Sequence, residues 1–186
     1  MSPITELIGG AKAYGWGSFA AVGDFESIAS YSIGSGGQAT ITFSSIPATF
    51  AHLQIRATLK QSIGSAAYAR FNSDSGSNYV RQRFLGNGSS ASGVADQNQD
   101  KVLINTSQGY SEFGIFIMDI WDYANTNKYK TEKHLFGIDL NGSGQVGIES
   151  NLWKSTSAIT SIEFISPNGG NYAQYSKFSL YGMRSA

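Results

Sequence analysis

Apolar and polar side chains alternate along most of this chain. Residues 52–60 show the pattern most clearly, because their apolar members fall on one side of an extended segment: Leu53, Ile55, Ala57 and Leu59. A period of two over such a stretch predicts a strand with one buried and one exposed face. Similar segments recur from residue 25 onward. The sequence predicts strands at about 25–33, 38–44, 52–60, 66–72, 78–84, 101–106, 111–121, 131–140, 145–149, 158–165 and 174–183.

Turn-forming residues separate these segments. Asn-Gly between strand-like segments favours a tight hairpin, so residues 131–149 are expected to fold back on themselves around Asn141-Gly142. A helical period is suggested only near 150–157, and there for a turn or two. Short strands joined by such turns, without helices between them, predict an all-β fold. We expect an antiparallel β-sandwich or jelly roll that covers residues 24–186 as one domain.

Residues 113–121 depart from the alternation, because both sides of the predicted strand are apolar. Ile115 and Ile117 lie on one side, and Phe116, Met118 and Ile120 lie on the other. A strand that is apolar on both sides requires cover on both sides. A two-layer sandwich supplies one cover, so the second must be a loop, an N-terminal arm or another subunit. We therefore predict a homo-oligomer, and assign Phe116, Met118 and Ile120 to its contact or arm-docking face.

Residues 1–23 differ from the rest of the chain, since glycines are interleaved with large apolar side chains. One interpretation is a frayed terminus, because ordering many glycines costs conformational entropy. Large aromatic side chains exposed in a loose tail are a liability, which favours the other interpretation. We predict an anchoring arm that docks on a neighbouring subunit or another protein through Tyr14, Trp16 and Phe19.

Charge narrows the classes of partner. Lys and Arg number 13, as do Asp and Glu, so the formal net charge is zero. Nucleic acids and anionic membranes require clustered basic charge, and neither is expected as a partner. Charged residues make up 14% of the chain, about half the usual share. Such a surface suits lateral packing against neighbours or extracellular exposure.

Two further observations concern the cellular setting. The chain contains no cysteine, which excludes disulfides and thiolate metal sites. Its first residues show no basic segment followed by an apolar run, and the longest apolar run is too short to span a bilayer. We expect a protein made in the cytosol, whose stability comes from packing and assembly.

Candidate catalytic groups are few. His52 and His134 lie far apart on predicted strands, and both are expected to point outward rather than to form a metal site or triad. Asp119 and Asp122 resemble a glycosidase pair, but residues three apart on a strand point to opposite faces. Asp122 is instead expected to begin a turn. The sequence predicts a non-enzymatic protein without a cofactor; a hydrolase, the alternative, requires both carboxylates in one cleft.

The segment Asp139–Val146 matches the first eight positions of a calcium loop, with oxygen-bearing side chains at the first, third and fifth positions and glycine at the sixth. The closing bidentate acid is missing, because the twelfth position is Ser150 and Glu149 comes one residue early. A hairpin turn is the preferred interpretation, and a weak Ca²⁺ site is the alternative.

Tyrosines and a tryptophan on the predicted strands and loops offer a second binding chemistry. Aromatic rings stack on sugars, but tyrosine is also common on sheet faces and in protein interfaces. The set comprises Tyr68, Tyr79, Tyr110, Tyr123, Tyr129, Trp153, Tyr172 and Tyr175.

Seven segments carry a resemblance to a known family, in order along about residues 25–183. Each one alone is a generic strand or turn, whereas the ordered set is specific. The segments are Gln38–Arg56, Arg70–Tyr79, Gly86–Ser90, Asp122–Thr131, Asn141–Gly144, Leu152–Ile162 and Asn171–Gly182. Together they resemble a family of small virion structural proteins of tailed bacteriophages, including cyanophages.

The resemblance implies a jelly-roll component of a virion with no enzymatic role. The favoured position is on the capsid, as a decoration (cement) protein that binds between major capsid protein units and stabilises the head. A tail, baseplate or fibre position is an alternative. By analogy with phage jelly rolls, the chain itself is expected as a partner, in a trimer, beside the major capsid protein or other virion proteins. A receptor- or carbohydrate-binding module, directed at a host-surface glycan, is the alternative from another class.

Overall fold

The computed structural model describes residues 25–63, 66–105 and 111–184. This part of the chain contains strands and no helix, so none of it forms a helix that could cross a membrane. The prediction of an all-β fold is confirmed. The strands are β1 (Phe25–Ser32), β2 (Thr40–Phe43), β3 (His52–Leu59), β4 (Ala67–Phe71), β5 (Tyr79–Gly86), β6 (Ala91–Gln99), β7 (Val102–Ile104), β8 (Gly114–Trp121), β9 (Lys130–Asp139), β10 (Gly144–Trp153), β11 (Ile162–Ile165) and β12 (Lys177–Met183).

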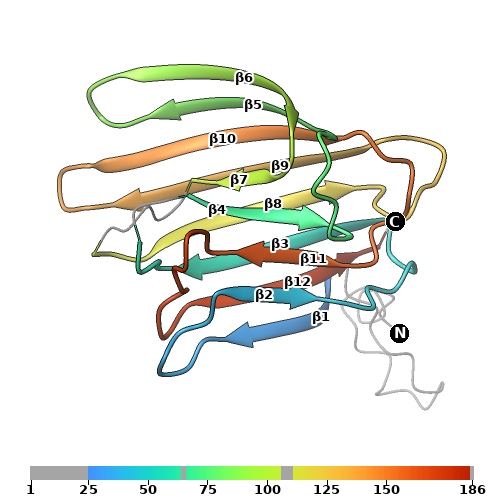
Figure 1. Ribbon diagram of the computed structural model, residues 1–186, viewed down its shortest axis with the longest axis horizontal. Coiled ribbons are helices and arrows are strands. Elements are labelled where there is room, and N and C mark those ends of the chain that lie inside the picture. Colours follow the sequence, from blue (N-terminus) through green and yellow to red (C-terminus); the bar gives the residue numbers. More distant parts are fainter. Residues whose placement is uncertain (1–24, 64–65, 106–110, 185–186) are drawn as a thin grey trace, which may run out of the picture.

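Two antiparallel sheets pack face to face as a β-sandwich. The large sheet has eight strands in the order β1-β12-β3-β8-β9-β10-β5-β6, and the small sheet has four in the order β2-β11-β4-β7. Viewed face-on, the small sheet lies over part of the large one, and the hairpin of β5 and β6 extends beyond it at the top (Figure 1). The large sheet therefore has an inner face toward the small sheet and an outer face directed away from it.

Aromatic side chains from both sheets form the core. The ring of Phe164 on β11 lies 5.5 Å from that of Phe116 on β8 and 5.4 Å from that of Phe178 on β12. Toward β5, the ring of Trp153 lies 5.8 Å from Phe71 and 6.4 Å from Tyr79. All six of these side chains are almost completely buried. Aromatic pairs of this kind, whether stacked, tilted or edge-to-face, add to the free energy of burying apolar surface.

The β9–β10 hairpin turns where the sequence predicts it. Asn141 and Gly142 both adopt positive φ, 58° and 98°, and the Leu140 N–H donates to the Ser143 carbonyl over 2.9 Å. Two central residues with positive φ match the twist of the flanking strands, and Asn-Gly adopts that conformation with little strain. The predicted hairpin is confirmed.

Two elements differ from the prediction. Strand β6 was not predicted, because most of its residues are small or polar and it is a largely exposed edge strand paired with β5 alone. Strand β10 continues to Trp153, through the first part of the segment in which a helical turn was suggested. Asn151 and Trp153 point inward from that strand, as Glu149 does. The strand is held extended because it pairs with β5 along one edge and with β9 along the other.

Strand β8 corrects the predicted contact face. Phe116, Met118 and Ile120 are 1%, 0% and 0% exposed and lie in the core, so their assignment to an oligomer or arm-docking face is wrong. The opposite side of the strand is exposed at Ile115 and Ile117. Alternation shows that both sides of this strand are apolar, but only the position of the small sheet decides which side it covers.

Candidate interaction surface

Six apolar side chains gather on the outer face of the large sheet, and we call them the outer patch. They come from four neighbouring strands, and each is between 38% and 59% exposed. The outer patch consists of Phe84, Ile115, Ile117, Leu135, Val146 and Ile148. Scattered exposed apolar residues are normal on a protein surface, whereas a contiguous cluster marks an interaction site.

Strand register places these side chains in two adjacent rows. In one row Ile117 on β8 lies opposite Leu135 on β9, which lies opposite Ile148 on β10, which lies opposite Phe84 on β5. Cross-strand neighbours of this kind have Cβ atoms about 4.5–5.5 Å apart, so each side chain of the row lies within reach of the next one across the sheet.

Glycines alternate with large side chains in the second row. Gly137 lies between Ile115 and Val146, and Gly86 lies beyond Val146. A Cβ atom at Gly137 would meet its nearest neighbour at 3.4 Å, and one at Gly86 at 4.0 Å, so the fold of one subunit leaves room for a side chain at either. The second row is therefore hollow at both glycines and raised at Ile115 and Val146.

Charges of both signs surround the outer patch. Arg56 and Lys133 are the cations of the outer face on β3, β8, β9, β10, β5 and β6, and Asp119 and Asp139 are the anions. The Asp119 carboxylate accepts a hydrogen bond from Gln54 Nε2 over 2.7 Å. Toward β1, the guanidinium of Arg56 stacks on the rings of Phe25 and Tyr181 at 5.3 and 5.0 Å. The patch thus has an apolar centre and a polar rim without net charge.

A second cluster of chemically capable side chains lies on the inner face of β5, β9 and β10. His134 Nδ1 lies 2.6 Å from a carboxylate oxygen of Glu132, whose other oxygen accepts a hydrogen bond from Asn151 over 2.7 Å. The Glu149 carboxylate accepts one from Asn105 over 2.6 Å. His134, Glu132 and Glu149 are at most 1% exposed.

The ionisation of this buried cluster is shifted. Burial by itself lowers the pKa of His134, but the carboxylates of Glu132 and Glu149 outweigh burial and the opposing charge of Arg81, so the His134 pKa is raised. Burial raises the pKa of Glu149, against the opposing effects of His134 and Arg81. Arg81 is in turn paired with Asp96 on β6. His134, Glu132 and Glu149 are closed off from solvent and pair with groups of the fold, so we assign the cluster a structural role.

The position of His134 corrects a prediction, since it points inward and not to solvent. Sequence reasoning also missed Glu132, Glu149 and Arg81. A signal was present, because His134 and Glu132 share their side of the strand with Phe136, which is buried. His52 is half-buried at the start of β3, where its Nδ1 accepts a hydrogen bond from the Asp122 backbone N–H over 3.1 Å.

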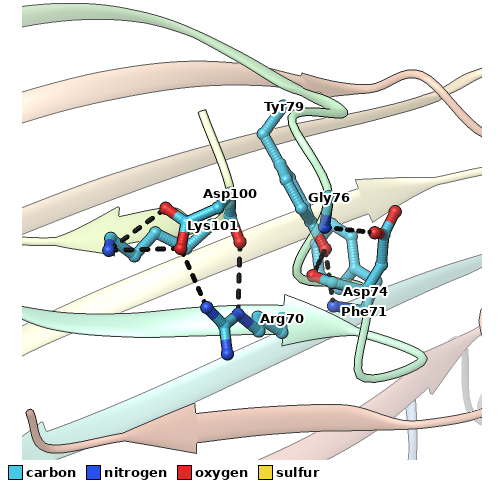
Figure 2. A network of polar contacts seen from close by, with 7 residues as sticks. All are labelled: Arg70, Phe71, Asp74, Gly76, Tyr79, Asp100 and Lys101. Carbon is cyan, nitrogen blue, oxygen red and sulfur yellow. Dashed lines mark hydrogen bonds and ion pairs between the residues drawn. The ribbon is translucent and has the colours of Figure 1, made fainter. Parts of the chain in front are cut away.

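A polar network orders the chain around the β4–β5 connection (Figure 2). Arg70 donates to the side chain and the backbone carbonyl of Asp100, at 2.9 and 3.2 Å, and Lys101 contacts the same carboxylate at 3.1 Å. The Tyr79 hydroxyl accepts from the Phe71 N–H and donates to the Asp74 carbonyl.

The Asp74 carboxylate completes this network from the turn. It accepts from the Gly76 N–H over 2.8 Å and from Trp153 Nε1 over 2.7 Å. Burial alone would raise the pKa of Asp74, but hydrogen bonds from Trp153, Asn78 and Gly76 lower it on balance. Each of these groups is held by a neighbour within the fold, so the network orders a turn.

The predicted acid pair is divided between different partners. Asp119 lies on the outer face beside Gln54, whereas Asp122 follows the end of β8 with a φ of 49° and pairs with Lys128. The Asn125 N–H donates to the Asp122 carbonyl over 2.9 Å, so the prediction that Asp122 begins a turn is confirmed.

The calcium-like segment forms the confirmed β9–β10 turn. One carboxylate oxygen of Asp139 accepts a hydrogen bond from the Asn141 N–H over 2.9 Å, which stabilises the turn. Across the described ranges, no three His, Asp or Glu side chains are grouped so that they could hold a metal ion.

The members of the aromatic set that lie in the described residues do not form the platform that sugar binding would require. Tyr79, Tyr123, Trp153 and Tyr172 lie in the core. Tyr129 and Tyr175 are exposed in loops, at 50% and 70%. Tyr68 is flanked by Arg70 and Lys101, whose charged groups lie 5.1 Å from its ring, and Tyr110 falls outside the described residues.

The predicted arm, with Tyr14, Trp16 and Phe19, also lies outside the described residues. No protein-family model, curated protein or solved structure matched the chain when each was compared with it.

Proposed function

We propose that this protein is a structural subunit that works by binding other protein, and that it belongs to the virion of a tailed phage as a capsid decoration protein. The observation that carries the proposal is the outer patch, a contiguous apolar surface on the outer face of the large sheet. The resemblance noted in the sequence supplies the setting. A neutral chain with few charges fits lateral packing between protein units.

The jelly-roll topology is part of this proposal. Leaving aside the hairpins β5–β6 and β9–β10, the large sheet has the order β1-β12-β3-β8 and the small sheet β2-β11-β4-β7. This order is the one expected for an eight-stranded jelly roll, in which successive strands pass between two sheets. The two extra hairpins widen the large sheet on one side, and three of their four strands carry part of the outer patch.

In this proposal the arm and the outer patch bind different partners. The arm at residues 1–23 anchors the subunit to the major capsid protein through Tyr14, Trp16 and Phe19, and the outer face holds subunits together. Several weak anchors on one oligomer hold far better than a single anchor, because each later contact forms at high effective concentration.

Particle composition and location test the proposal. Purified virions of the phage that encodes this chain should contain the protein in many copies, as measured by mass spectrometry, and a map of the intact particle should place it on the head. Density on the tail or baseplate would move it to the alternative virion position. Absence from purified particles would overturn the proposal, as would selective binding of the isolated protein on a glycan array.

The arm is tested by substitution within the full chain. Replacing Tyr14, Trp16 and Phe19 together by serine should leave the thermal unfolding midpoint unchanged and reduce cosedimentation with particles that lack the protein. The matched control replaces Tyr129 and Tyr175, which are exposed loop aromatics elsewhere on the molecule. Full particle binding by the arm variant would show that the arm is not the anchor.

A further inference from the structure

We infer that the outer patch binds a second copy of this chain, with the outer faces of two large sheets packed against each other about a two-fold axis. This inference rests on the proposed function and names the partner of its exposed sheet face. Four observations carry it: the glycines of the patch, the size of the face, its charge, and the surface it leaves free.

The glycines indicate that something approaches the sheet closely. Glycine within a strand is less favourable than alanine and often marks a place where another backbone or a ligand comes near. Gly147 and Gly182 are explained by the subunit itself, because a Cβ atom there would lie 2.5 Å from Phe136 and 2.3 Å from Phe50. Gly137 and Gly86 have no such neighbour, and neither has a positive φ.

These two glycines lie on the outer face, beside the exposed Ile115 and Val146. Their hollows accept protruding side chains from a facing surface. Sheets that pack face to face interdigitate in this way at a separation of about 10 Å. The outer face therefore has the alternating hollows and protrusions of a sheet that packs against another sheet, although no part of the described chain covers it.

The size of the face fits a pair of identical subunits. The patch is centred between β9 and β10. A two-fold axis at that point places six strands of one copy against the same six strands of the other. In sheet order these are β3, β8, β9, β10, β5 and β6. Six strands of about eight residues cover roughly 750 Å² at the spacings usual for sheets. A stable interface of standard size takes about 800 Å² from each partner.

The charge of the face favours a copy of itself over a charged partner. The outer side of these six strands carries two cations, Arg56 and Lys133, and two anions, Asp119 and Asp139. Two copies therefore meet without net repulsion, and a two-fold axis allows cations of one to approach anions of the other. A partner of strong charge of either sign gains nothing from this face.

Pairing through the outer face leaves the small sheet and β1 exposed, so these parts of the molecule can bind other virion proteins. The small sheet is on the opposite side of the sandwich, and β1 lies at the far edge of the large sheet from β6. The described chain begins at Phe25 on β1, so this end of it lies outside the six paired strands. A dimer formed this way presents two anchors.

Self-association of the full-length protein tests the inference. Sedimentation velocity from about 1 to 100 μM, the weak end of the range for standard interfaces, should show a species with the mass of two chains. Leu135→Lys, at the centre of the patch, should weaken the dimer at least tenfold, because it buries an unpaired charge. Tyr129→Lys is the matched control, since Tyr129 is similarly exposed in a loop, and it should associate like the natural protein.

Gly137→Val and introduced cysteines locate the interface. Valine suits a strand and should not lower the unfolding midpoint, but it fills a hollow and should weaken the dimer at least tenfold. The chain has no cysteine, so Leu135→Cys or Ile148→Cys gives one thiol near the axis. Copper-phenanthroline oxidation should join two such chains through a disulfide, whereas Tyr129→Cys should remain uncrosslinked.

Four results would overturn the inference. They are a monomer across the concentration range, a trimer, a dimer insensitive to Leu135→Lys, and a dimer lost when Trp16 and Phe19 become serine, which would make the N-terminal segment the occupant. Each of these leaves the proposed virion role standing, because particle composition is measured separately. Conversely, absence from virions would remove the phage role while a patch-dependent dimer persisted.

Discussion

At the scale of single residues, the inner and outer faces of the large sheet place different demands on the same amino acid. Gly147 on β10 pairs with Phe136 on β9, and Gly137, the next residue of β9, pairs with Val146. Although the two glycines are this close, Gly147 faces the filled core and Gly137 faces open space. Glycine is required at the inner position by packing, whereas at the outer position no neighbour in the described chain requires it, as expected if a second copy packs there.

Gly147→Ala and Gly137→Ala should therefore have opposite effects on folding. Alanine at 147 would place its Cβ atom 2.5 Å from the Phe136 ring and 2.8 Å from the Phe84 carbonyl oxygen, and overpacking of this kind costs about 1–3 kcal/mol. Alanine at 137 should be neutral or stabilise the fold by up to about 1 kcal/mol. Denaturant unfolding of the two variants measures both, and equal effects would contradict the assignment of the faces.

The buried His134 cluster makes stability depend on pH. The pKa of His134 is raised in the fold, so its contribution is present below about pH 6.5, the value of a free histidine, and is lost as the pH rises through its folded pKa. The raised pKa of Glu149 acts in the same direction, because the fold favours its protonated form. The groups that face His134 are Glu132, Glu149 and Arg81.

The free energy of unfolding should therefore fall as the pH is raised above about 6.5, the value of a free histidine. His134→Gln should be less stable at pH 6 and should lose most of this slope, because glutamine does not titrate. His52→Gln is the control, since it leaves the buried cluster intact. Chemical unfolding at a series of pH values measures the slope, and a flat or rising profile in the natural protein would refute the account.

At the scale of elements, hydrophobic periodicity located most strands, because a half-buried strand must alternate. It missed β6, whose small and polar residues contribute almost nothing to the core. It also assigned the wrong side of β8 to the contact face, since both sides are apolar and alternation alone does not distinguish them. The outer patch could not be predicted as a unit, because its members come from four strands that only the register brings together.

Alanine substitutions on the two sides of β8 should separate core from contact surface. Phe116→Ala should destabilise the fold by about 3–5 kcal/mol, because it removes a buried ring from between the sheets. Ile117→Ala should cost at most about 1 kcal/mol, as is usual for exposed positions, and should instead weaken self-association. Unfolding and sedimentation on the same samples measure the two effects. A reversed order would restore the sequence-based assignment of Phe116 to a contact face.

At the scale of the whole molecule, a sandwich of two layers leaves the broad outer face of its eight-stranded sheet uncovered by the described chain. The large sheet exceeds the small one by four strands, and the uncovered outer face is apolar at its centre. Its rim charges balance, as do those of the whole chain. Association through such a face depends on apolar burial rather than on long-range electrostatic attraction.

Self-association should accordingly be insensitive to salt. Raising sodium chloride from about 50 to 500 mM screens surface charges strongly, yet it should change the dissociation constant of the dimer by no more than about twofold, or tighten it slightly. Sedimentation at both salt concentrations provides the measurement. A tenfold weakening at high salt would show that ion pairs, and not the outer patch, hold the subunits together.

The sequence by itself determined the strand content, the Asn141-Gly142 hairpin, the turn at Asp122 and the balanced charge, because each depends on local conformational preference or on composition. Only the tertiary structure decided that Phe116 faces the core and Ile117 faces out, that His134 is buried among carboxylates, and that six apolar side chains form one patch. These features depend on which sheet lies over which face and on the register of strands distant in sequence, and alternation along a single strand carries no information about either.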